Sequence, residues 1–531
     1  MNRRVLLVLC LAQFLMVLDS AVMNVSISQL VEDFDTSVTT IQLAITFYSL
    51  VMAAFMITGG KLGDRWGRKT AFRTGLFIYA IGSGITAIAP NVGILILGWS
   101  VIEGIGAALV MPAMVALVAS NFSGEKRAAA YGLLGGVAGA GIAVGPILGG
   151  WVTTNLTWRL VFAGEVVVAA FILLLSGALV EGVKKAEAKM DWLGSALSAV
   201  GLGLVVFAVL QSSAWGWFVP KNSPIEPFGL SLTVFVLLAG IVLLLLFARW
   251  QRFCEDSRRE PLIHLAMLKV PQLRAGVVMF LSQNTILMGV FFAIPLYLQV
   301  VQGFNALETG LRMLPVSVAL FLTSMSGPAL LRRYSPRLIV RSGLIILGFA
   351  TVALLALIDP NIANAKFLTA MAFLGIGIGL LASQLGNIVQ SAVNEEQRSE
   401  AGGLQFTAQQ LGASIGTALI GAVVIGSLAT SLLNLVQNDP AISDAVRQQV
   451  GIQLESGVSF VPVSEAETAM RQAGLSESDV TKLSRDYADA QLQGLRTGLF
   501  LAAVIVIISL FFTKDLPKRK FGEIPATASV P

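Results

Sequence analysis

The chain has 531 residues, of which 55% are hydrophobic and only 13% are charged, and its mean hydropathy is +0.79. Soluble globular proteins carry about 25% charged residues, so this composition excludes a soluble enzyme and indicates a protein that crosses a membrane repeatedly. The net charge is +5. The basic residues are spread over many short loops, so they indicate membrane topology and no nucleic-acid partner.

Few residues in the chain suit metal or nucleophilic chemistry. His264 is the only histidine, and Cys10 and Cys254 stand far apart in segments of different character. We therefore expect no disulfide, no metal site and no Ser-His catalysis.

Apolar segments of about 20 residues can cross a bilayer as helices, and the chain contains about fourteen of them. The first follows Arg3 and Arg4 and includes Asp19, and it is too long for a signal peptide. The segments lie near 5–28, 41–60, 71–89, 93–119, 128–152, 158–180, 192–212, 228–248, 275–301, 309–331, 338–358, 366–393, 401–428 and 495–513. We predict an all-α integral membrane protein.

Loops rich in basic residues alternate along the chain with loops that have few. If the N-terminus is inside, the inner loops hold most of the lysines and arginines, near 61–69, 126–127, 184–185, 249–259, 332–337, 398 and 514–520. The outer short loops hold few. The asymmetry places both termini in the cytoplasm.

An internal repeat divides the chain. Glu125-Lys126-Arg127 precedes Gly141, Gly145 and Gly150, and 271 residues later Glu396-Gln397-Arg398 precedes Gly412, Gly416 and Gly421. We predict two pseudo-symmetric six-helix bundles, at 1–182 and 275–531, with two inserted membrane helices at 183–259. Residues 260–274 are expected to form an amphipathic surface helix. Residues 430–493 are polar and acidic, and we expect an external loop with some helix.

A charged hairpin between two apolar runs reads Gly60-Lys61-Leu62-Gly63-Asp64-Arg65-Trp66-Gly67-Arg68-Lys69-Thr70. Two further motifs lie inside predicted spans, Leu18-Asp19-Ser20-Ala21-Val22-Met23-Asn24-Val25 and Gly141-Ile142-Ala143-Val144-Gly145-Pro146-Ile147-Leu148-Gly149-Gly150. With these motifs the chain resembles the fourteen-span drug:proton antiporter branch of the major facilitator superfamily, which implies multidrug efflux driven by protons.

Two of the motifs have a mechanical interpretation. The hairpin, with Gly60, Gly63, Asp64, Arg65, Gly67 and Arg68, is expected to act as a conformational latch, in which the Asp64 carboxylate accepts hydrogen bonds from a helix N-terminus and pairs with arginine. The alternative is a topology anchor only, and the specific spacing of the glycines and the acid favours the latch. For the 141–150 motif, with Gly141, Gly145, Pro146 and Gly149, the resemblance implies a hinge or gate that favours export. Close helix packing explains the same glycines equally well.

Two positions depart from the family pattern. The fourth span reads Trp99-Ser100-Val101-Ile102-Glu103-Gly104-Ile105-Gly106, so its usual arginine is absent and Glu103 replaces an amide. On the sixth span Glu165 stands where an asparagine is usual. The proton pathway of relatives that have the arginine therefore does not transfer unchanged.

Asp19, Glu103 and Glu165 lie well inside apolar runs. A charge at the bilayer centre costs about 2.5–3.5 kcal/mol or more, so such residues face a cavity or a partner. Desolvation and mutual repulsion favour their protonated forms, which suits a carrier of protons that releases them to admit cationic substrates. The alternative is a structural role for protonated acids bonded between helices.

The predicted substrate cavity combines adaptable apolar and uncharged polar side chains. Ordinary packing and helix-to-helix hydrogen bonds are the alternative explanation for these residues. The candidates are Met16, Met23, Trp99, Met111, Gln283, Asn284, Gln384, Asn387 and Gln409.

The function favoured by these features is export of amphipathic, often cationic, organic compounds in exchange for protons by alternating access. No nucleotide-binding motif is present, so the proton motive force replaces a cofactor. The expected partners are membrane lipids, small amphipathic substrates and protons, for a monomer in the cell membrane. An exporter of lipid or a hydrophobic metabolite is the rival function. Uptake by symport and a membrane enzyme fit less well.

Overall fold

The computed structural model describes residues 3–122, 124–180, 190–221, 223–257, 259–331, 333–393, 398–438 and 460–518. The side chains of Asp64 and Pro146 are among a few inside these ranges that lie outside the description. Over the described residues the chain forms helices and no strands. Thirteen of these helices are long and apolar enough to cross a membrane, which confirms the predicted all-α membrane fold.

The N-terminal half contains six long helical units, the fourth of which includes a π-helix. The elements are α1 (Arg3–Val25), α2 (Ile27–Asp33), α3 (Val38–Trp66), α4 (Arg68–Ala87), α5 (Val92–Leu95), η1 (Ile96–Glu103), α6 (Gly104–Asn121), α7 (Gly124–Asn155), α8 (Arg159–Leu175) and η2 (Ser176–Ala178). Helix α4 is not among the thirteen candidate spans, and it carries Arg68, Lys69 and Arg73 in its first six residues. It nevertheless packs between α6 and α8 inside the bundle.

The remaining chain consists of an inserted helix pair and a second bundle. The inserted part contains α9 (Trp192–Trp215), η3 (Pro227–Gly229) and α10 (Leu232–Asp256), followed by the short turn η4 (Leu265–Lys269). The second bundle contains α11 (Pro271–Leu296), η5 (Tyr297–Val301), α12 (Ala306–Met325), α13 (Gly327–Leu331), α14 (Pro336–Leu357), α15 (Asn364–Ser391), α16 (Arg398–Asn438), α18 (Val463–Gln472), α19 (Glu477–Phe512) and η7 (Thr513–Asp515).

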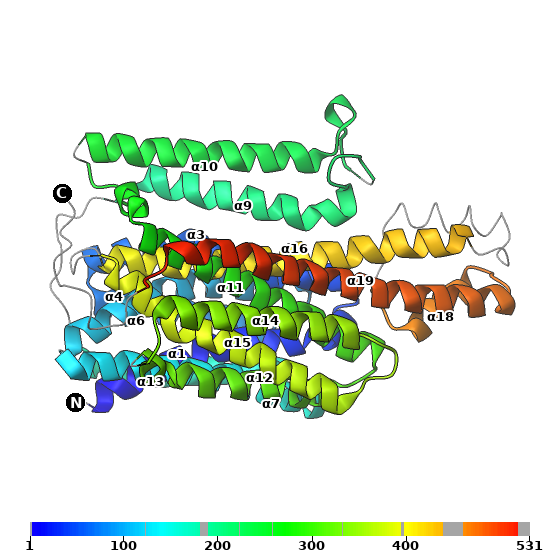
Figure 1. The fold of residues 1–531 in the computed structure, drawn as a ribbon, viewed down its shortest axis with the longest axis horizontal. Coiled ribbons are helices and arrows are strands. Elements are labelled where there is room, and N and C mark those ends of the chain that lie inside the picture. The colour runs from blue at the N-terminus through cyan, green and yellow to red at the C-terminus, as the bar shows by residue number, and fades with distance from the viewer. Residues whose placement is uncertain are drawn as a thin grey trace.

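The long helices run side by side, and the start of α1 and the end of α19 lie at the same end of the molecule (Figure 1). We call this the terminal end. The opposite end carries α18 (Figure 1). The inserted pair stands beside the bundles, with α9 against α3 and α16. Thr58 of α3 donates a hydrogen bond to Ser195 of α9 at 3.0 Å.

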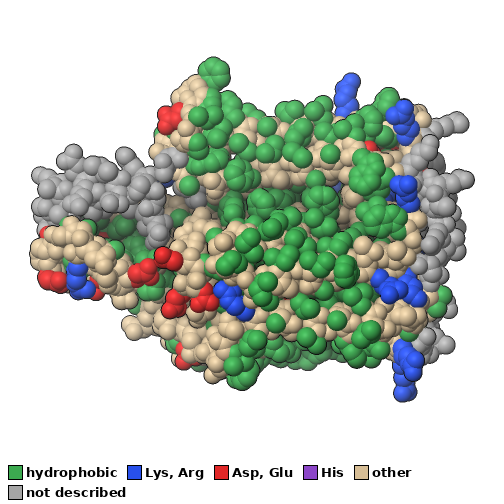
Figure 2. All heavy atoms as spheres, turned by 180° about the vertical axis from the view of Figure 1, so that it is seen from behind, with side chains coloured by type: hydrophobic (Ala, Val, Ile, Leu, Met, Phe, Trp, Pro, Cys, Tyr) green, Lys and Arg blue, Asp and Glu red, His purple; other side chains and the backbone are tan. Residues whose placement is uncertain are grey.

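The surface has the charge distribution of a membrane protein. Figure 2 shows hydrophobic side chains across the middle of the molecule, basic side chains gathered at the terminal end, and acidic side chains toward the opposite end. Large apolar side chains such as Phe77, Leu174 and Phe349 are more than half exposed. Lipid is the solvent that such a belt requires.

Glycines allow the paired helices of both halves to approach closely. A Cβ at Gly141 would lie 2.9 Å from Val17 Cγ1 of α1, and one at Gly149 would lie 3.0 Å from Val22 Cα. In the second half, a Cβ at Gly416 of α16 would lie 2.9 Å from Thr285 Cα of α11. Helices α7 and α16 therefore contact equivalent partners, as the internal repeat predicts.

Two predicted segments differ in the structure. Within 260–274 only Leu265–Lys269 is helical before α11 begins at Pro271. The Gln251 side chain accepts hydrogen bonds from the backbone N–H groups of Leu262 (2.6 Å) and Ile263 (3.1 Å), which holds this part in a non-helical path. The expected loop 430–493 is shorter, because α16 continues to Asn438 and α19 begins at Glu477. The segment 439–459 lies outside the described residues.

Candidate functional site

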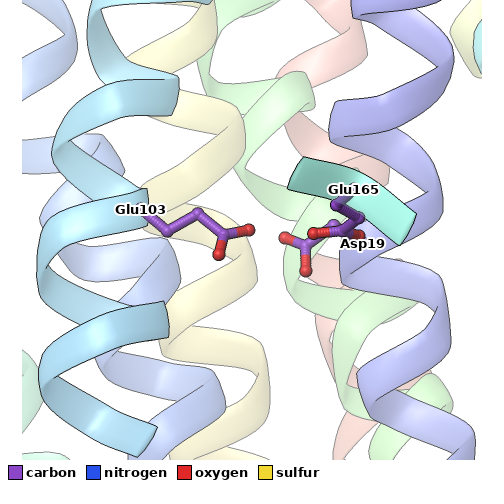
Figure 3. Close-up of side chains that lie close together, drawn as sticks. All are labelled: Asp19, Glu103 and Glu165. Carbon is purple, nitrogen blue, oxygen red and sulfur yellow. The ribbon is translucent and has the colours of Figure 1, made fainter. Parts of the chain in front are cut away.

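Three buried carboxyl groups from different helices meet inside the N-terminal half (Figure 3). Asp19 belongs to α1, Glu103 ends the π-helix η1, and Glu165 belongs to α8. Their exposed fractions are 1%, 0% and 2%, and one oxygen of each lies within 4.8 Å of the others. The sequence places each acid in an apolar run, and the fold brings all three together. We call them the acid cluster.

Close backbone packing positions Glu103. A Cβ at Gly82 of α4 would lie 2.6 Å from the Glu103 nitrogen and 2.7 Å from its Cβ. Only glycine leaves room for η1 at this point. The π-helix itself rotates the side chains that follow it relative to an α-helix, and such π segments are frequent at functional sites.

Four hydrogen bonds hold the acids in place. Trp99 Nε1 donates to Asp19 Oδ1 at 2.8 Å, and Tyr79 OH donates to Glu165 Oε2 at 3.1 Å. Ser83 Oγ lies 2.9 Å from Glu103 Oε2 and 3.3 Å from Glu165 Oε2, so one hydroxyl bridges the two glutamates. These hydrogen bonds fix one oxygen of each acid in a position that faces the other two acids.

Half of the cluster's oxygens have no hydrogen-bond partner within the described part of the chain. These buried atoms are Asp19 Oδ2, Glu103 Oε1 and Glu165 Oε1. Among the described residues no ion pair involves any of the three acids. Carboxylates at this spacing and out of water cannot all be charged at low cost, so the arrangement is chemically suited to hold and release protons. The same oxygens are close enough to contact a metal ion, although the sequence predicts no metal site.

A cavity of about 1690 Å³ lies between the two halves. At the terminal end its walls include Lys61, Arg68, Glu260 and Glu400, which lie near helix ends or in the linker before α11. The halves meet at the opposite end, where Gln299 Nε2 donates to Val25 O at 2.9 Å and Leu307 N donates to Thr154 Oγ1 at 3.1 Å. The cavity therefore reaches the terminal end and is closed at the other.

Most of the predicted cavity residues line this space, and two do not. Those in the wall are Met16, Trp99, Met111, Gln283, Asn284, Asn387 and Gln409. Met23 is fully buried in the apolar core, near the C-terminal end of α1. Gln384 is also fully buried, and its Nε2 donates to Ser383 Oγ at 3.0 Å. Helical periodicity alone does not distinguish these faces.

The acid cluster lies one layer behind the cavity wall. None of the three acids lines the cavity, whereas Tyr48 and Trp99 do. Their rings stack at a centroid distance of 4.7 Å and an angle of 6°. Since Trp99 also donates to Asp19, the indole joins the cavity wall to the acids directly.

Tyr48, Tyr79 and Ser83 were not predicted as site residues from the sequence. Tyr79 and Ser83 are four residues apart and therefore share a face of α4. Their hydroxyls in an apolar helix were a usable signal, because buried hydroxyls in lipid-facing proteins seek partners. Tyr48 gave no such spacing signal.

The hairpin at 60–70 has a clear structural basis. Gly67 has φ 101°, a backbone conformation that favours glycine, and it separates α3 from α4. Arg68 Nη1 lies 3.4 Å from Ala116 O and 3.3 Å from Ser120 Oγ of α6. The Lys61 ammonium donates to Pro261 O of the linker before α11. The side chain of Asp64, the acid expected in the latch, lies outside the described residues, as does that of Pro146 in the expected hinge.

Comparison with known proteins identifies the family. Residues 9–417 match the model of the Major Facilitator Superfamily. The chain belongs to this superfamily. Its members are transporters, so the superfamily assignment makes this chain a multi-pass membrane transporter.

Two relatives show which members of the superfamily it is similar to. The tetracenomycin C resistance and export protein of Streptomyces glaucescens is 27% identical, over 79% of this chain and 75% of the relative. The puromycin resistance protein of Streptomyces alboniger is 29% identical, over 80% of this chain and 82% of the relative. Both are named for drug resistance.

A solved structure supports the fold. A bacterial homologue of the human lysosomal transporter Spinster, in an inward-facing and unoccupied conformation, gives a TM-score of 0.64 over 98% of each chain at 14% identity. At this identity the likeness concerns the fold alone.

Proposed function

We propose that this superfamily member exports amphipathic organic compounds from the cell in exchange for protons, by alternating access of the cavity. The acid cluster carries the proposal. Three buried carboxyl groups without a basic partner among the described residues converge within 4.8 Å, and Trp99 connects them to the cavity wall. Such acids inside a membrane are costly and mark ion or proton pathways. The resistance and export names of the relatives support the direction and the cargo.

The orientation follows from the charge of the two ends. Basic side chains gather at the terminal end (Figure 2), and basic residues stay on the cytoplasmic side of membranes. Both termini are then cytoplasmic, and the cavity opens inward. Alternating access requires the terminal end to close and the contacts between Val25 and Gln299 and between Thr154 and Leu307 to separate.

Proton flow supplies the energy in this proposal. One proton that moves inward through 100 mV provides about 2.3 kcal/mol before any pH gradient is added. In this proposal the chain acts as a monomer in the cell membrane. Its partners are lipid, cargo and protons, and it is a transporter that uses no cofactor, catalyses no reaction and binds no nucleic acid.

The test is cargo transport by purified protein in liposomes with an imposed pH gradient. Asp19→Asn, Glu103→Gln and Glu165→Gln should each lower proton-driven transport at least about tenfold, because each removes a proton site. Glu226→Gln is the matched control, since Glu226 is an exposed acid in a loop. Unchanged transport by all three variants and by their combination would contradict the proposal.

A sodium gradient provides a second arm, because the cluster's oxygens could also contact a metal ion. We expect transport to follow the pH gradient and to ignore sodium. Transport that follows the sodium gradient at constant pH would show that the cluster exchanges a metal ion instead.

A further inference from the structure

The charged residues of the cavity wall lie at its mouth. Among the described residues, those in the wall are Lys61, Arg68, Glu255, Arg259, Glu260, His264 and Glu400. All lie near helix ends or in the linker at the terminal end. They include three basic and three acidic side chains, so the mouth does not select one sign of charge. The deeper wall contains no described charged side chain.

The acid cluster does not act as a counter-charge for cargo in this conformation. Its side chains are at most 2% exposed and lie behind Tyr48 and Trp99, which occupy the wall. A cation in the deeper part of the cavity would therefore lack a carboxylate contact. A charge that leaves water without a counter-charge is disfavoured.

The second half presents amides to the cavity. Seven amide side chains from α11, α15 and α16 line it, namely Gln283, Asn284, Asn387, Gln390, Gln405, Gln409 and Gln410. Gln405, Gln409 and Gln410 are partly exposed and make no hydrogen bond within the described part of the chain. Free amides both donate and accept hydrogen bonds, but they do not neutralise a full charge. We call these seven residues the amide wall.

The opposite wall carries fewer amides, namely Gln13 and Asn24, together with Ser20 and Ser49. Val17 of α1, with Gly139 and Ile142 of α7, adds apolar surface from the first half. Met16 and Met111 add flexible side chains that adapt to different shapes. The cavity therefore carries most of its amides on the second half, while the first half contributes apolar surface and fewer polar groups.

From this distribution, and because the deeper wall holds no described charge, we propose that the cavity binds uncharged organic molecules whose edges carry hydrogen-bonding groups, and that permanent cations are poor cargo. The polar edge of the molecule bonds to the amide wall. The inference rests on the proposed export function and departs from the expected preference for cations. If cargo is neutral, each exchange moves net positive charge inward, so a membrane potential alone drives export.

The experiment compares two molecules of the same shape. Acridone is uncharged and carries an N–H and a carbonyl, whereas 10-methylacridinium is a permanent cation. Full-length protein in liposomes is given a pH gradient with the membrane potential held at zero, because exchange of a monovalent cation for one proton is electroneutral and a potential alone would not drive it. Fluorescence reports accumulation of each molecule. We expect acridone to be transported at least about tenfold better than the cation. Equal or better transport of 10-methylacridinium would overturn the inference and leave the export function intact. Transport of neither molecule under potential and pH gradients combined would reject both.

A charge placed in the amide wall tests the same inference by gain of function. Gln409→Glu should raise 10-methylacridinium transport and lower that of acridone, because it supplies the missing counter-charge. Gln405→Glu, one turn earlier on the same helix, should do the same if the first variant folds poorly. Gln472→Glu, on the exposed helix α18, is the matched control. No change in preference from either cavity variant would contradict the role of the amide wall.

Discussion

In the proposed mechanism, the Trp99 side chain is the contact through which cargo in the cavity affects the acid cluster. Its ring stacks on Tyr48 in the cavity wall, while its N–H donates to Asp19 at 2.8 Å. Cargo that moves the indole would change the hydrogen bond of a buried carboxyl group. Hydrogen bonds to charged groups contribute about 1.5–3 kcal/mol, enough to alter proton binding at Asp19.

Trp99→Phe tests this link, since it keeps an aromatic ring beside Tyr48 and removes only the donor to Asp19. We expect cargo binding to persist while proton exchange per cargo molecule falls, with transport reduced about tenfold or more. Binding and proton flux are measured on the same liposomes. Trp192→Phe, on the exposed face of α9, is the control. Normal proton exchange by Trp99→Phe would show that the indole is only a packing residue.

The residues of the acid cluster were predictable singly, because each stands in an apolar run. Their meeting was not predictable, because it depends on helix packing that involves Gly82 and the π-helix η1. The same limit explains Met23 and Gln384, which share helix faces with cavity residues but point into packed interfaces. Tyr48 was missed because one hydroxyl in an apolar helix gives no pattern.

At the scale of elements, the contact between α4 and η1 places Glu103. Gly82 of α4 contacts Glu103, and Gly84 on the same helix provides a comparison. A Cβ at Gly82 would lie 2.6 Å from Glu103 N, whereas one at Gly84 would lie 3.8 Å from its nearest described atom, Val166 Cγ2. Gly82 and Gly84 lie on the same helix, but only Gly82 is in close contact with a neighbouring backbone.

Gly82→Ala should destabilise the protein by about 1–3 kcal/mol, because the new methyl group forces α4 away from η1. Gly84→Ala should change stability by no more than about 0.5 kcal/mol. Thermal unfolding of both variants in detergent measures the difference. Equal stabilities would show that the α4–η1 contact is looser than the structure indicates.

Secondary structure that depends on tertiary contacts could not be predicted from the sequence. The span order and the repeat followed from hydropathy and charge, because lipid imposes long apolar helices. The segment 260–274 failed as a helix because Gln251, on α10, captures its backbone N–H groups. Helices α16 and α19 extend beyond the predicted spans with polar sequence, which hydropathy assigns to a loop.

At the scale of the molecule, the two halves meet at one end and separate around the cavity at the other. Residues 154 and 307 mark the closed end, where Leu307 N donates to Thr154 Oγ1 at 3.1 Å. Export by alternating access requires this contact to break in every cycle.

A disulfide across the closed end should therefore stop transport. We expect Thr154→Cys with Leu307→Cys, in a chain with Cys10→Ser and Cys254→Ser, to lose transport when oxidised and to recover it when reduced. Cargo binding from the terminal end should persist in the oxidised protein. Full transport by the oxidised, cross-linked protein would contradict alternating access.

Proton release from purified protein tests the central claim most directly. Acridone is added to the protein in weakly buffered detergent solution, and a pH dye records released protons. We predict release by the unmodified chain and by Glu226→Gln, and none by the combined Asp19→Asn, Glu103→Gln and Glu165→Gln variant, provided that this variant still binds acridone. Undiminished release by the combined variant would show that the protons come from elsewhere and that the acid cluster is structural.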